Sequence, residues 1–197
     1  MNPPFLQWHF VPAHSHVKPQ QFIFSSSRYR FDSILADYLI GAIDGFSPFY
    51  QEQIFSKLVS HLSPGGRIYV VGLNPIPDSV EGNGDVFCRV TKARDACILL
   101  AGHRCYREYP VEWIEGQLIN NNLNIIESRR FPILYSYASI LRQINVARTK
   151  LPLFKNAVLR EGMKVHLEDL EKESLLMTKN ESVRLRLGFD YVVVAQK

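Results

Sequence analysis

The chain has 197 residues, 46% of them apolar, and its 23 Lys and Arg residues exceed its 19 Asp and Glu residues to give a net charge of +4. This composition is typical of ordinary soluble domains and excludes a wholly disordered chain, a fibrous protein and a small domain held together by disulfides. The cysteines are odd in number and form no C-x-x-C pair, so we expect free thiols in an intracellular, cytoplasmic protein: Cys88, Cys97 and Cys105.

The same counts exclude several kinds of partner. In residues 131–197, eleven basic residues alternate with seven acidic ones. This mixture is typical of a solvated helix face, so nucleic acid is not the expected partner. No apolar run approaches the roughly 20 residues of a membrane span, and the N-terminus does not resemble a signal peptide, so no membrane association is expected. No metal site is expected, because the clustered His9, His14 and His16 have no second pair of ligands further along the chain.

The first predicted elements form one βαβ unit. Residues 1–30, rich in proline and histidine, predict an irregular lead-in before an α/β domain over residues 31–197. The apolar run from Phe31 to Ala36 predicts a buried strand ending at Asp37, and the glycines and proline after it predict a loop. Apolar spacing over 49–62 predicts a helix that Ser63-Pro64-Gly65-Gly66 ends. The apolar run 67–73 predicts the second strand, parallel to the first.

The remaining elements continue the α/β pattern. The sequence predicts helices over 85–100, 111–120, 136–149 and 153–177, and strands over 124–130 and 189–195. Pro110 suits the first turn of the helix that follows it.

Three common enzyme motifs are missing from this sequence. Gly82-Asn83-Gly84 lacks the third glycine and the preceding strand of a dinucleotide fingerprint, and is better explained as a surface turn. There is no G-x-x-x-x-G-K-[ST] phosphate loop and no G-x-S-x-G nucleophile elbow. A nucleotide-binding reductase and a serine hydrolase are therefore disfavoured.

The order of elements around Asp37 resembles the second half of class I S-adenosylmethionine-dependent methyltransferases. In that family the fourth strand begins with a Phe/Tyr-Asp pair, as Phe31-Asp32 does, and ends in a small or acidic residue, as at Asp37. The next helix ends in a Pro-Gly-Gly turn, and the fifth strand begins at once. The resemblance implies a partial Rossmann-like sheet with strands in the order 4-5-7-6, helices on both faces and extra C-terminal helices.

The resemblance also implies a site. Ligands of open α/β sheets bind outside the carboxyl ends of the strands, where Asp37 and Tyr38 lie. We expect both residues to bind S-adenosylmethionine and Asp37 to be catalytic, although Asp37 is equally explained as a polar residue at a strand end. A second cluster suits a lid over the substrate or, alternatively, packing of the loop: Tyr106, Arg107, Tyr109 and Trp113.

One family feature is absent, which leaves two functions open. No G-x-G precedes Asp32, so we expect a chain truncated at its N-terminus, with an incomplete cofactor site. The chain would then work with a cofactor-binding half supplied by another chain. Alternatively, it is a non-catalytic interaction module that forms homo- or hetero-oligomers through the exposed edge from Phe31 to Ala36, or through helix 153–177. The methyl acceptor, a small molecule or a protein, is not predicted by the sequence.

Overall fold

The computed structural model describes residues 29–197, so the predictions for the histidine cluster and for nearly all of the lead-in lie outside the described residues. Contacts divide the described chain into two compact units. The first, here called the sheet unit, comprises residues 29–74, 106–131 and 190–197. The second, the helical unit, comprises residues 75–105 and 132–189. Strands β3 and β4 each contribute residues to both units.

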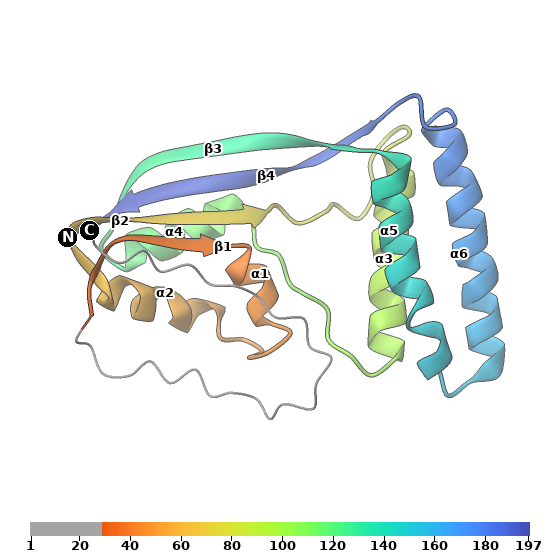
Figure 1. Ribbon diagram of the computed structural model, residues 1–197, viewed down its shortest axis with the longest axis horizontal. Helices are drawn as coiled ribbons and strands as arrows, with labels where there is room; N and C mark the ends of the chain where they lie inside the picture. Colours follow the sequence, from red (N-terminus) through yellow and green to blue (C-terminus); the bar gives the residue numbers. More distant parts are fainter. Residues whose placement is uncertain (1–28) are drawn as a thin grey trace. The chain divides into compact units, whose positions relative to one another are not determined.

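The sheet has four strands, β1 Phe31–Asp37, β2 Leu62–Leu73, β3 Asn124–Tyr135 and β4 Leu185–Gln196 (Figure 1). Their order is β1-β2-β4-β3. β1 pairs with β2 in parallel, whereas β2 pairs with β4 in antiparallel. Numbered as in a complete methyltransferase sheet, this is the order 4-5-7-6, so the predicted sheet is confirmed.

Alternating apolar residues hold the centre of this sheet. Ile34 and Ala36 of β1 lie opposite Ile68 and Val70 of β2, and all four are 1% exposed or less. Beside the sheet, α2 Gln51–Ser60 contacts β2 and also contacts α4 Val111–Asn120. α2 buries Ile54, Phe55 and Leu58, which the three- and four-residue spacing predicted. The helix is shorter than the predicted 49–62, since Phe49 precedes it and is 68% exposed and Leu62 belongs to β2.

Two local predictions in the sheet unit are wrong. The segment after Asp37, predicted as a loop, contains the short helix α1 Leu39–Ile43, which forms because its apolar side chains are buried. The Pro-Gly-Gly segment is part of β2 rather than a turn before it. Leu62 pairs with Phe31, the register then shifts, and Gly65 takes a positive φ of 76° that favours glycine.

The helical unit consists of α3 Asp85–Leu100, α5 Tyr137–Arg148, the 3₁₀ turn η1 Leu151–Leu153 and α6 Ala157–Met177. Side-chain caps begin two of these helices, since Ser136 Oγ accepts a hydrogen bond from Ser139 N and Asn156 Oδ1 accepts one from Leu159 N. The predicted single helix 153–177 is therefore shorter and starts after η1. Its buried face packs on α3 and α5 through a shared core: Val90, Cys97, Ile140, Ile144, Leu167 and Leu170.

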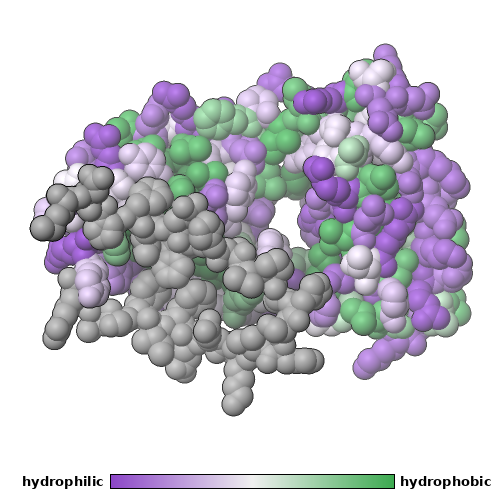
Figure 2. All heavy atoms as spheres, viewed as in Figure 1, coloured by the Kyte–Doolittle hydropathy of each residue, from purple (hydrophilic) through white to green (hydrophobic). Residues whose placement is uncertain are grey.

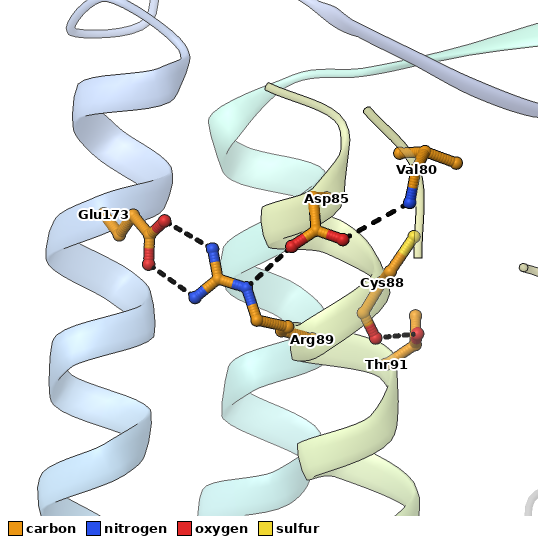
Figure 3. Close-up of polar contacts among 6 residues, drawn as sticks. All are labelled: Val80, Asp85, Cys88, Arg89, Thr91 and Glu173. Atoms are coloured by element: carbon orange, nitrogen blue, oxygen red, sulfur yellow. Dashed lines mark hydrogen bonds and ion pairs between the residues drawn. The ribbon is translucent and has the colours of Figure 1, made fainter. Parts of the chain in front are cut away.

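Ion pairs connect these helices at their edges. The guanidinium of Arg89 on α3 binds both carboxylate oxygens of Glu173 on α6 and also Asp85 one turn earlier (Figure 3). Hydrogen bonding to Arg89 lowers the pKa of Glu173 below its usual value. The visible surface of the helical unit is mostly hydrophilic, with apolar patches between the charged residues (Figure 2). Within residues 29–197, no helix has the length and apolar character needed to cross a bilayer.

Candidate functional site

The candidate site begins at the carboxyl end of β1. Asp37 pairs with Val71 of β2, and its side chain is exposed. Tyr38 follows directly, donates its backbone N–H to the Val71 carbonyl at 3.0 Å, and caps the start of α1. Its φ of 45° is in the left-handed region, which is unfavourable for an aromatic residue. Such strain persists only where surrounding contacts impose it, and it occurs often at functional sites.

The negative charges of three carboxylates act on the Tyr38 hydroxyl. Burial, followed by interaction with Asp190, raises the pKa of Tyr38 to about 12, and the negative charges of Asp37 and Glu108 act in the same direction. Asp190 is placed there by the antiparallel pairing of β4 with β2, in which it lies opposite Leu73. At neutral pH Tyr38 therefore keeps its proton and can serve as a hydrogen-bond donor, but not as a base.

Tyr191 is the buried residue beneath this end of the sheet. This residue is 1% exposed and lies opposite Gly72 of β2, where a Cβ atom would come within 2.3 Å of the Tyr191 hydroxyl. Only glycine leaves room for the ring at this position. The hydroxyl donates a hydrogen bond of 3.1 Å to the backbone carbonyl of Tyr109. Tyr191 thereby fixes the 106–110 loop to the end of the sheet.

Glu108 reaches the site from that loop. A Cβ atom at Gly41 of α1 would lie 2.2 Å from a carboxylate oxygen of Glu108, so the carboxylate lies directly against the α1 backbone. Arg107 N donates a hydrogen bond of 3.1 Å to the Gly41 carbonyl and holds the loop on this helix. At the end of β2, Asn74 Oδ1 accepts a hydrogen bond from Val111 N, the first residue of α4.

The four residues predicted to contact substrate lie beside α2 and the segment that joins α1 to α2. The Arg107 guanidinium is 5.5 Å from the ring centre of Phe49, and the Tyr106 ring is close to Gly45. Tyr109 stacks on Trp113 at 4.2 Å, and Trp113 meets Phe55 of α2 edge-on at 6.0 Å. Tyr106 is exposed, at 57%, whereas Tyr109 and Trp113 are partly buried.

The structure thus brings Asp37 and Tyr38 together and adds three residues that the sequence analysis missed, Glu108, Asp190 and Tyr191. Glu108 stood unnoticed inside the predicted cluster 106–113, and Asp190 inside a predicted strand. Together the carboxylates create a negative potential at the carboxyl ends of β1 and β2. Such an edge can attract a cation, accept a proton through Asp37 and offer a hydrogen bond through Tyr38.

Comparison with known proteins gives similarity at the level of the fold. No protein-family model matches the chain, and no curated protein matches its sequence. A cyclopropane-fatty-acyl-phospholipid synthase-like protein from Lactobacillus casei is similar at a TM-score of 0.50 and 12% identity, over 86% of this chain and 57% of that protein. A candidate methyltransferase from Bacillus halodurans matches 92% of this chain and 69% of its own length, at 15% identity and a TM-score of 0.49. An S-adenosylmethionine-dependent methyltransferase from Archaeoglobus fulgidus gives 14% identity and a TM-score of 0.41, over 85% of this chain and 60% of that protein.

The chain therefore has a class I methyltransferase-like fold over most of its length. It spans just over half of the Lactobacillus protein.

Proposed function

We propose that the sheet unit forms part of an S-adenosylmethionine-dependent methyl-transfer site at the carboxyl ends of β1 and β2. The observation that carries this proposal is the grouping of Asp37, Tyr38, Glu108 and Asp190 at that edge of a methyltransferase-like sheet. Open α/β sheets bind their ligands at this edge.

The charges of these residues are complementary to the charge of the cofactor. When bound, S-adenosylmethionine supplies a methyl group on a positively charged sulfur. Three carboxylates favour a cation at this position, since their negative charges act together beside the buried Tyr191. The site is complementary to the sulfonium group rather than to an anionic ligand.

Asp37 and Tyr38 have different roles in this proposal. Asp37 is the exposed carboxylate, so it can reach the acceptor and take the proton that the acceptor loses. Tyr38 remains protonated, because its pKa is about 12, and since its single O–H is directed to Asp190, its oxygen can orient a ligand by accepting a hydrogen bond. Asp190 acts as a positioning residue that holds the Tyr38 hydroxyl.

We further propose that these residues supply only part of the cofactor site. The sequence contains no glycine before Gly41, so it does not contain the glycine-rich cofactor loop that precedes the fourth strand in this family. A cofactor-binding half would pair along β1, which lies at the edge of the sheet among residues 29–197.

Calorimetry and a paired substitution test this function. Asp37→Asn should abolish methyl transfer and leave the melting temperature nearly unchanged, because the side chain is exposed. The matched control is Asp32→Asn, an exposed aspartate at the opposite end of the same strand, which should leave the rate unaltered. An unchanged rate in Asp37→Asn would remove this residue from the site. Tight binding of S-adenosylmethionine by the purified chain alone would contradict the partial site.

A second candidate function is a non-catalytic interaction module. It is favoured by the position of β1 at the sheet edge, since an unpaired strand is a template for another chain. Sedimentation velocity of the purified chain over a range of concentrations distinguishes the two functions. A stable dimer without cofactor binding would support the module, and a monomer at all concentrations would oppose pairing between copies.

A further inference from the structure

A surface pocket in the helical unit lies apart from the residues discussed so far. It is formed where α5 ends, at η1 and along the first turns of α6. Its volume is about 430 Å³, and its lining residues are Arg148, Leu151, Pro152, Arg160, Glu161 and Lys164. The pocket is shallow and open to solvent.

Positive charge dominates the lining. Three of its six residues are cations and one is a carboxylate. The surrounding segment, residues 142–166, contains six Lys and Arg residues and a single acidic residue, Glu161. The basic excess of the chain is therefore concentrated in this segment of the sequence, of which Arg148, Arg160 and Lys164 line the pocket. The rest of α6 contains both acidic and basic residues.

The three cations differ in their ion-pair partners. Arg148 is bound to Glu171 of α6, which fixes the direction of its guanidinium. Lys164 pairs with Glu161 at 3.3 Å, but both side chains are more than half exposed, so this pair is weak. Arg160 is exposed, and within residues 29–197 no carboxylate lies within ion-pairing distance of it.

The positions of Arg148, Arg160 and Lys164 bring their positive charges to the same pocket. Arg160 and Lys164 are separated by four residues and so lie on the same face of α6. Arg148 comes from the last turn of α5 and faces the pocket from the other side. Leu151 and Pro152 of η1 provide an apolar wall beside the cations. An anionic group with an apolar neighbour matches this arrangement in charge and polarity.

We propose that this pocket binds the phosphate group of an organic phosphoester, with the apolar part of the ligand on Leu151 and Pro152. Arginine guanidiniums bind phosphate oxygens through paired, charge-assisted hydrogen bonds. Because Arg148 is already bound to Glu171, the phosphate would be held chiefly by Arg160 and by Lys164, in competition with Glu161 for Lys164. The proposal is independent of the methyl-transfer function, since none of its residues belongs to the sheet unit.

The phosphate has two chemical sources, a soluble phosphoester or a phospholipid headgroup, and two probes distinguish them. The first is calorimetric titration with inorganic phosphate, against chloride at the same ionic strength. The second is co-sedimentation with phosphatidylcholine vesicles that contain phosphatidic acid, against vesicles of phosphatidylcholine alone. Binding of free phosphate without binding to vesicles indicates a soluble ligand. Binding to the acidic vesicles, with or without free phosphate, indicates a lipid headgroup.

A charge reversal tests the site itself. Arg160→Glu should weaken phosphate or vesicle binding about tenfold or more, because it replaces a charge-assisted donor by a repelling group. The introduced carboxylate would face Lys164 one turn later, so the helix and the melting temperature should be retained. The matched control is Lys172→Glu, the same charge change on the same helix outside the pocket, at a side chain that is 73% exposed.

Two results would overturn the proposal. One is the absence of binding in both titrations. The other is equal weakening by Arg160→Glu and Lys172→Glu, since this would show a response to net charge rather than to the pocket.

Discussion

The sheet unit and the helical unit hold their polar side chains in different ways. In the sheet unit the backbone does the positioning. Tyr38 is held at a positive φ, and Gly41 and Gly72 leave the space that Glu108 and Tyr191 occupy. In the helical unit side chains position one another, as Arg89 does between Asp85 and Glu173.

This difference indicates where chemistry is expected. Strained or closely packed backbone has an energetic cost that other contacts must offset, so it persists where a side chain has to be held in one place. Partly exposed ion pairs between helices contribute little each and can be replaced without loss of fold. Positive φ alone does not distinguish the units, since Lys179, Asn180 and Glu181 of the helical unit also have positive φ. What distinguishes Tyr38 is the group of carboxylates whose charges act on its hydroxyl, and this is why we expect the reaction in the sheet unit.

The substitution with the largest expected loss of stability tests whether the two units are stable independently. Leu167→Ala removes a side chain of α6 that is 0% exposed, so the helical unit should lose about 2–5 kcal/mol of unfolding free energy. Hydrogen exchange should show faster exchange in α3, α5 and α6 and unchanged protection in β1 and β2. Val165→Ala, at a site on the same helix that is 48% exposed, should change stability by about 0.5 kcal/mol or less. An equal loss of protection in β1 and β2 would show that the units unfold as one.

Removal of an ion pair between helices should cause a smaller loss of unfolding free energy, and this loss should decrease as the pH falls. Arg89 lowers the pKa of Glu173 in the folded state. The pair therefore stabilises the fold above the unfolded pKa of glutamate, about 4.3, and this contribution disappears as the pH falls through the lower folded pKa. Arg89→Met should cost about 1.5 kcal/mol at neutral pH, because partial exposure screens the pair.

Urea unfolding at a series of pH values measures this effect. The difference between Arg89→Met and the parent chain should shrink from pH 7 towards acid. Lys164→Met breaks a more exposed ion pair, so the dependence of its unfolding free energy on pH should be the same as in the parent chain. A difference that stays constant with pH would show that Arg89 acts through packing of its stem rather than through Glu173.

Much of the helical unit could be predicted from local signals in the sequence. The helix 85–100 has the predicted bounds, and the helix 136–149 differs only by its capping residues, Ser136 and Thr149. Apolar periodicity and capping act over a few residues, so a short window of sequence contains them. The strand order was also predicted, but from family resemblance rather than from periodicity.

The site could be predicted only in part. Asp37 and Tyr38 were predicted as site residues because they lie at the carboxyl end of a strand, where open α/β sheets bind their ligands. Glu108 and Asp190 could not be found in this way. They reach Tyr38 through a loop fixed by Tyr191 and through the register of β4 on β2, which depend on contacts between residues far apart in the chain. The positive φ of Tyr38 also left no local signal, because tyrosine itself does not favour this conformation.

A third substitution examines how the sheet unit fixes its loop. Tyr191→Phe removes the donor to the Tyr109 carbonyl and should cost about 1 kcal/mol. The amide of Arg107, which donates to Gly41 in the same loop, should exchange faster. Tyr69→Phe in β2 is the control, since the Tyr69 hydroxyl makes no hydrogen bond to another of residues 29–197. Unchanged exchange at Arg107 would mean that the ring of Tyr191, and not its hydroxyl, holds the loop.

The smallest change in stability should accompany a complete loss of function, at Tyr38. Tyr38→Gly relieves the strain of an aromatic residue at φ 45°, but it also adds chain entropy to the unfolded state and removes the interaction with Asp190. These terms oppose one another, so the unfolding free energy should change by about 0.5 kcal/mol or less, while methyl transfer is lost. Asn122→Gly makes the same backbone change at φ 60° after α4, away from Asp37, and should leave the reaction intact.

Tyr38→Phe keeps the ring and the strain, so retained activity in this variant would remove the hydroxyl from the mechanism. If Tyr38→Gly instead lost several kcal/mol, the strained residue would be a structural element, and the difference between the two units would no longer indicate where the reaction occurs.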